Sequence, residues 1–183
     1  MGSMNSPNAA LVQFIGQEAG KRLAGNAPLN VDAAQVRTLG NEVPKGASID
    51  VCADRITFKT ATVSFVIEAV PPNNPDMTFR IAGLVNPTVV VPLGAKVTVE
   101  FINADKDQAH GWVITGTQPP FAFRQATPPA LNGASAAVIG DPTAAGDGAR
   151  MIAFVAGTKG TYHYLCPMPG HAQMGMAGIL IVE

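Results

Sequence analysis

From about residue 49 to the C-terminus, short runs of β-branched and aromatic residues alternate with turns rich in glycine, proline and asparagine. This spacing is typical of β-sandwiches and barrels. The 19 glycines and 15 prolines among 183 residues favour many turns over long helices. The sequence therefore predicts an all-β sandwich with strands at 55–59, 62–70, 77–82, 88–91, 95–103, 111–115, 150–155, 161–166 and 177–182.

Apolar and polar side chains alternate within the run 96–102. Such alternation predicts an antiparallel strand with one face in the core and one in solvent. The stretch 116–148 is rich in Ala, Gly, Pro and Thr and has weak periodicity, so we expect a long excursion ordered partly by packing. In the run 96–102, the expected core-facing residues are Val97, Val99 and Phe101, and the outward-facing ones are Lys96, Thr98 and Glu100.

The N-terminal part has a helical rather than a strand pattern. Apolar spacing predicts one helix within 8–24 and a second over 31–39, with Asn30 as its N-cap and Gly40 just past its end. Residues 1–4 resemble an expression-vector remnant, so a natural signal peptide or membrane anchor is compatible with the chain but absent from it. We expect a helical extension over 5–48 and a single β domain over 49–183.

Composition excludes several classes of function. Charged residues make up 14% of the chain, against roughly 25% in an average soluble protein, and the formal net charge is −1. The chain therefore lacks the strong positive charge that would attract nucleic acid or an anionic membrane surface. The most apolar window, Ala61 to Val70, is interrupted by Glu68 and is far shorter than the roughly 18 residues of a membrane span.

The segment 160–182 concentrates metal-binding side chains between two predicted strands. Cys166, His171 and two methionines, Met174 and Met176, lie within one turn-rich loop. Thiolate, imidazole and thioether together suit copper better than magnesium, calcium or a structural zinc. A trigonal copper site needs a second imidazole, and His110, between two predicted strands, is the expected donor.

The other residues of this segment have simpler interpretations. Alternation along 161–166 directs Tyr162, Tyr164 and Cys166 to the core face and turns His163 outward, where we expect a surface residue. Cys52 lacks basic neighbours and is expected to be a buried structural thiol. Without a metal, the same sequence would describe a secreted β-sandwich with a Cys52–Cys166 disulfide.

The run Gly160–Gly178, with the pattern Gly-Thr-Tyr-x-Tyr-x-Cys-x-x-Pro-Gly-His-Ala-x-x-Gly-Met-x-Gly, resembles the cupredoxins, the small blue copper proteins. Within that family it is similar to the rusticyanin group, with the sulfocyanins as a sibling alternative. The similarity extends upstream through Asn86-Pro87-Thr88 and the region of His110. Gly111 departs from the pattern, because the rusticyanin group has a hydroxyl residue directly after its first ligand histidine.

The resemblance implies a Greek-key cupredoxin sandwich that holds one type 1 copper ion. It implies an electron carrier rather than an enzyme, a monomer in the periplasm or elsewhere outside the cytoplasm, cycling Cu(I)/Cu(II) between larger redox partners of a respiratory chain. Cytochromes or an oxidase are the expected partners, with no nucleic acid and no small-molecule substrate. By the same resemblance, the copper ligands are His110, Cys166, His171 and Met176.

Three further hypotheses concern this site. The alternative to an electron carrier is a copper storage or delivery protein, whereas multicopper enzymes need more histidines than the three present. Partners are expected to dock near His171, on the loop 167–170 and Ala172, with the ring edge of His171 as the electron port. The side chains expected to form an apolar surround of the copper are Trp112, Phe121, Phe123, Met168 and Met174.

Overall fold

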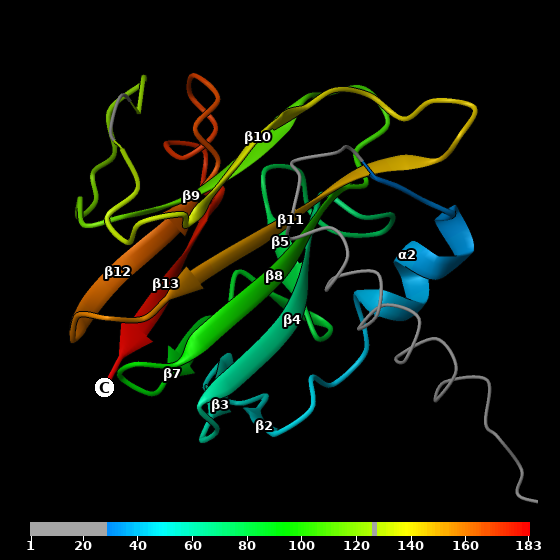
Figure 1. Cartoon of the computed structure of the whole chain (residues 1–183). Helices are drawn as coiled ribbons and strands as arrows, with labels where there is room; N and C mark the ends of the chain where they lie inside the picture. The colour runs from blue at the N-terminus through cyan, green and yellow to red at the C-terminus, as the bar shows by residue number, and fades with distance from the viewer. Residues whose placement is uncertain (1–28, 126–127) are drawn as a thin grey trace, which may run out of the picture.

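The computed structural model describes residues 29–125 and 128–183 and shows two β-sheets packed face to face (Figure 1). Both sheets mix parallel and antiparallel pairs. In spatial order, the first sheet contains β1 (Leu29–Val31), β11 (Asp147–Val155), β8 (Lys96–Asn103), β4 (Thr62–Ala69), β5 (Phe79–Ile81) and β6 (Leu84–Val85). The second contains β10 (Ser135–Ile139), β9 (His110–Thr115), β12 (Gly160–Leu165), β13 (Ala177–Val182), β7 (Thr88–Val91), β3 (Arg55–Phe58) and β2 (Ala47–Asp50).

The all-β sandwich and its nine predicted strands are confirmed, with ends that differ by a few residues. Four short strands, β1, β2, β6 and β10, were not predicted. β10 lies inside the expected excursion 116–148 and pairs with β9, so part of that excursion belongs to the second sheet. The main core fills the space between the sheets and includes Val97, Val99 and Phe101, as expected for the inner face of β8.

The one helix of the described residues, α2 (Ala33–Leu39), begins later than predicted. Its N-cap is Asp32 rather than Asn30, because the Asp32 carboxylate accepts a hydrogen bond from the N–H of Ala34 at 2.7 Å and Gln35 reciprocates at the N–H of Asp32. Asn30 instead belongs to β1, which pairs with β11. The helix predicted within 8–24 lies outside the described residues.

The second half of the outer face of β8 is covered, which corrects the expectation of a half-solvated strand for Glu100, whereas Lys96 is exposed as expected. Side chains of α2 and of the edge strand β1 form a second apolar cluster with Ile102, so Ile102 is fully buried and Glu100 is only 8% exposed. β8 is antiparallel to β11 but parallel to β4. Residues 29–48 therefore contribute a strand and a helix to the sandwich, and the domain boundary at residue 49 stays a prediction.

Among the described residues, no helix has both the length and the apolar character required to cross a membrane. Figure 1 shows α2 beside the first sheet, at the right of the view. The loop after β12 lies at the top of the second sheet, next to the chain that follows β9. The predicted copper ligands lie in that loop and at the start of β9.

Candidate metal centre

Three adjacent strands of the second sheet bring the predicted ligands to one end of the sandwich. His110 is the first residue of β9, Cys166 directly follows β12, and Met176 directly precedes β13. β12 is antiparallel to both β9 and β13, so its end lies beside their beginnings. Between β12 and β13 the chain makes a compact loop that carries His171, whose N–H donates to the carbonyl of Met168 at 3.2 Å.

The side chains of His110, Cys166 and His171 converge on a common centre. The two Nδ1 atoms lie 3.2 Å apart, and the Cys166 Sγ lies 3.7 Å from Nδ1 of His110 and 3.5 Å from Nδ1 of His171. An ion bound in the plane of two nitrogens and one sulfur, with bonds of about 2.0 and 2.3 Å, requires about 3.5 Å between the nitrogens and about 3.7 Å between nitrogen and sulfur, and the observed separations match these to within about 0.3 Å. The triangle of donors therefore fits a first-row transition metal.

Burial disfavours the charged forms of Cys166 and His171. It raises the pKa of the Cys166 thiol, although the N–H groups of Gly111 and Met168 oppose the rise. Burial, with His110 alongside, lowers the pKa of His171 and keeps its imidazole neutral. A neutral imidazole is ready to bind a metal, and a cation would compensate the thiolate charge that burial disfavours.

Met176 completes the predicted set from the strand side. It is fully buried. Its N–H donates to the carbonyl of His171 at 3.0 Å, and its own carbonyl accepts from the N–H of Cys166 at 3.1 Å. The Met176 backbone is thus held against two of the three converging residues. Met174, the alternative thioether, is 59% exposed.

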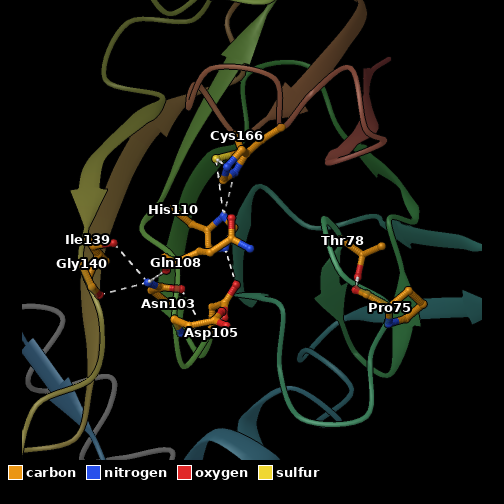
Figure 2. A network of polar contacts seen from close by, with 11 residues as sticks. Pro75, Thr78, Asn103, Asp105, Gln108, His110, Ile139, Gly140 and Cys166 are labelled. Carbon is orange, nitrogen blue, oxygen red and sulfur yellow. Dashed lines mark hydrogen bonds and ion pairs between the residues drawn. The ribbon is translucent and has the colours of Figure 1, made fainter.

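A polar network behind His110 was missed by the sequence analysis. The Oδ2 atom of Asp105 lies 2.7 Å from Nε2 of His110, on the side of the ring opposite Cys166, as Figure 2 shows. Burial opposes ionisation of Asp105, but hydrogen bonds from His110 and the backbone of Asp107 outweigh it and hold the pKa of this carboxyl below its usual value. The available signal was a carboxylate five residues before a predicted ligand, at the end of a strand.

The expectation for His163 is wrong. The side chain does point away from the main core, but it is only 7% exposed. Its ring meets the edge of Phe121, with centroids 5.4 Å apart, because the chain after β9 folds back over the outer face of β12. Burial lowers the pKa of His163, opposed by a hydrogen bond with the Thr117 backbone.

The expectations for the cysteines are also corrected. Both are free thiols, which overturns the alternative of a sandwich closed by a Cys52–Cys166 disulfide. Cys52 is exposed rather than buried, because it lies in the turn between β2 and β3. Only Cys166 is buried, at the centre of the donor cluster.

The expected apolar surround is divided between the interior and the surface. Trp112 and Phe121 are buried and Met168 is half-buried. Phe123 and Met174 are 57% and 59% exposed, so they do not enclose the site as expected. They meet over Gly170, where an added Cβ would lie 3.2 Å from the Phe123 ring and 3.8 Å from the Met174 methyl.

Comparison with known proteins gives concordant matches. Residues 73–183 match the family model of copper-binding proteins of the plastocyanin/azurin family. Rusticyanin of Acidithiobacillus ferridurans is 36% identical over 133 residues, covering 73% of this chain and 70% of the relative. A rusticyanin of Acidithiobacillus ferrooxidans is 37% identical over 130 residues, covering 71% and 82%.

Solved structures agree with these sequence matches. Rusticyanin from Thiobacillus ferrooxidans superposes with a TM-score of 0.75 at 31% identity, over 87% of this chain and 99% of the other. A reduced rusticyanin superposes with a TM-score of 0.74 at 31% identity, over 86% and 100%. The sandwich fold is therefore shared with solved rusticyanin structures.

Proposed function

The chain belongs to the plastocyanin/azurin family of copper-binding proteins and to its rusticyanin branch, and on this premise we propose how it carries electrons. It holds one type 1 copper ion through His110, Cys166, His171 and Met176. It passes single electrons between larger proteins of a respiratory chain, such as cytochromes or an oxidase, in the periplasm or elsewhere outside the cytoplasm. The metal supplies the one-electron couple Cu(I)/Cu(II). The protein holds the donors in a fixed geometry and provides the surface on which redox partners dock.

The observation that carries this proposal is the buried triangle of two imidazole Nδ1 atoms and one thiol. Two nitrogen and one sulfur donor in a plane, with a thioether available nearby, are typical of electron-transfer copper sites. The His110 side chain is fully buried and Cys166 is 0% exposed, so the cluster is closed to bulk water. A closed site favours a resident redox centre over the exposed, exchangeable site of a storage or delivery protein.

The strands keep the donors in place during electron transfer. His110 and Cys166 are attached to paired strands, and the loop between β12 and β13 is tied by backbone hydrogen bonds, including that from Met176 to His171. Donors on such a frame move little when the charge of the site changes by one unit. A geometry that serves both oxidation states without rearrangement keeps the reorganisation energy low.

Partners are proposed to dock on the apolar surface around His171. Nδ1 of His171 faces the other donors, so the rest of the ring points away from them. His171 is 7% exposed; its loop also carries exposed Pro169 and Met174 and half-buried Met168, and exposed Phe123 lies over the adjacent Gly170, a set that we call the His171 rim. An uncharged apolar rim allows close approach of a partner without desolvation of charge.

Substitutions on the rim test the docking surface. Met174→Glu or Met168→Glu should slow electron exchange with a redox partner while the visible spectrum stays unchanged. Leu93→Glu, which also charges an exposed apolar side chain but on the loop before β8, is the matched control. Equal exchange rates in the three variants and the parent protein would remove the docking surface from the proposal.

The site itself is tested by its spectrum. Copper is added to the purified protein, the sample is oxidised, and the visible absorption and electron paramagnetic resonance are recorded for the parent and for Cys166→Ala. We expect an intense thiolate-to-copper band with a narrow copper hyperfine splitting, both absent from the variant. A colourless parent protein, or a band that survives in Cys166→Ala, would contradict the proposed function.

A further inference from the structure

The carboxylate of Asp105 faces the one nitrogen of His110 that is not directed at the donor cluster. We propose that Asp105 is a positioning residue that orients His110 and lowers the reduction potential of the copper site. This inference rests on the proposed function, because it concerns the same site. It adds a residue that neither the ligand pattern nor the family match identifies.

The geometry divides the two nitrogens of His110 between two tasks. Nδ1 lies 3.7 Å from the Cys166 sulfur and 3.2 Å from Nδ1 of His171, whereas Nε2 lies 2.7 Å from Oδ2 of Asp105. With Nδ1 reserved for the metal, the ring proton belongs on Nε2, where it is donated to the carboxylate. A hydrogen bond to a carboxylate is stronger and more directional than one to a neutral acceptor.

Asp105 is itself held in place by its own chain. Its N–H donates to Oδ1 of Asn103, and its Oδ1 accepts from the N–H of Asp107, each at 3.2 Å. The Asn103 amide donates in turn to the carbonyls of Ile139 and Gly140 at 3.1 and 3.0 Å, which joins the end of β8 to the end of β10 (Figure 2). The carboxylate therefore has little freedom to leave His110.

No competing cation claims this carboxylate in the described part of the chain. The adjacent Lys106 pairs instead with Asp147, with Nζ 3.0 Å from Oδ1. The ion pair recorded for Asp105 is with His110, and both side chains are buried. The negative charge is thus directed at the imidazole rather than neutralised by a surface partner.

A negative charge on the far side of a ligand imidazole favours the oxidised metal. The carboxylate makes the Nδ1 lone pair a stronger donor, and its field acts more on the ion of higher charge. The affinity for Cu(II) therefore rises more than the affinity for Cu(I), and the reduction potential falls. Gly111 offers no side-chain hydrogen bond to the site and contacts Cys166 only through its backbone N–H.

The test compares Asp105→Asn, which preserves size and an acceptor oxygen, with Asp141→Asn, which removes an exposed carboxylate next to Gly140, in the same region but without a hydrogen bond to His110 among those of the described residues. Competition titrations with Cu(II) and Cu(I) chelators give both affinities, and spectroelectrochemistry gives the potential. We expect Asp105→Asn to weaken Cu(II) binding by about tenfold to a hundredfold and Cu(I) binding by less. Each tenfold selective loss raises the potential by about 59 mV.

A potential for Asp105→Asn no higher than that of Asp141→Asn, in a protein that still shows the type 1 spectrum, overturns the inference and leaves the proposed function intact. A parent protein without that spectrum overturns the proposed function instead. Equal losses of Cu(I) and Cu(II) affinity would show a merely structural role, because a structural defect does not distinguish the oxidation states.

A measurement on the parent protein tests the hydrogen bond between His110 and Asp105 directly, even if Asp105→Asn fails to fold. In the diamagnetic Cu(I) form, long-range proton–nitrogen correlation spectra report the tautomer of His110. We expect a downfield proton on Nε2 that exchanges slowly with water. A ring without a proton on Nε2, or one whose proton exchanges as fast as that of an exposed histidine, contradicts the hydrogen bond on which the inference depends.

Discussion

Two buried carboxylates, Asp105 behind the metal centre and Glu68 beneath α2, have pKa values shifted in opposite directions. Burial raises the pKa of Glu68 to about 7, although Arg80 lies 2.8 Å from its Oε2. The pKa of Asp105 is lowered; this side chain is also buried but lies less deep than that of Glu68. Asp105 uses both oxygens as acceptors, whereas Oε1 of Glu68 has no hydrogen-bond partner among the described residues.

The difference teaches that the balance between depth of burial and hydrogen-bond donors decides the charge of an interior carboxylate. At the metal centre, the His110 ring and the N–H of Asp107 donate to Asp105 and outweigh its burial. Beneath α2, Arg80 and the backbone of Gly40 donate to Glu68, but its deeper burial outweighs them. Asp105 therefore favours its ionised form beside the metal centre, whereas Glu68 is only partly ionised near neutral pH.

The largest expected effect comes from removing the partner of Glu68. Arg80→Met should lower the free energy of unfolding by about 3 to 5 kcal/mol at pH 8, because an unpaired buried carboxylate remains. Denaturant unfolding measures the loss, and exposed Arg55→Met is the control. The copper spectrum should not change. A loss below about 1 kcal/mol would mean that water reaches Glu68 in the folded protein.

The second effect is a pH dependence that originates at Glu68. Between its ordinary pKa of 4.5 and about 7, the folded protein keeps a proton that the unfolded chain releases. The free energy of unfolding therefore falls as pH rises through this window, by about 3 kcal/mol at most. His163 and His171, with lowered pKa values, act in the opposite direction, so the informative quantity is the difference from Glu68→Gln.

That difference between the parent protein and Glu68→Gln should decrease by up to this amount from pH 4.5 to pH 7. It is measured by urea unfolding at half-unit steps of pH, with both proteins loaded with copper. Parallel curves for the two proteins would show that Glu68 has the same pKa in the folded and unfolded states.

The stability gained on copper binding should depend on Asp105 at the metal centre but not on the Glu68–Arg80 pair. At a free copper concentration of 100 times Kd, the metal adds about 2.7 kcal/mol to the free energy of unfolding. This increment should be the same in Arg80→Met, whereas a tenfold weaker Asp105→Asn should lose about 1.4 kcal/mol of it at the same copper concentration. Thermal unfolding with and without copper measures the increments, and a reduced increment in Arg80→Met would show that the regions are coupled.

The smallest effects come from a matched pair of glycines. An added Cβ at Gly40 would overlap the Glu68 carboxylate, so Gly40→Ala should cost about 2 kcal/mol. At Gly111 the Cβ would lie 3.1 Å from the Pro167 ring and 3.3 Å from exposed Val138, which can give way. Gly111→Ala should cost below about 1 kcal/mol. The reverse order in denaturant unfolding would place the tighter packing at the metal centre.

Much of the fold could be predicted because its signals are local. Period-two runs such as 62–69 and 96–103 state their own secondary structure, and glycine and proline mark the turns between them. β10 was missed because its alanines have little strand preference, and it forms a strand by pairing with β9. β1 has three residues and owes its conformation to β11.

The errors at the site have one physical origin. His163 was expected on the surface because alternation along β12 tells which face a side chain occupies, but not what covers that face. Glu100 was assigned to solvent for the same reason, and α2 with β1 proved to cover the region. Asp105 is recognisable as a partner of His110 only in the folded structure, where the segment 105–110 turns back and brings the two side chains together.

The sequence by itself determined the chemistry that this protein can perform. A thiol, an imidazole and a thioether within one loop, between strands of clear periodicity, indicate copper in a β-sandwich, and the family match confirms both. The tertiary structure decided where His110 meets that loop, which outer faces are buried, and which carboxylate keeps its charge. These depend on contacts between residues far apart in the chain, and no local pattern encodes the neighbours that folding brings against a side chain.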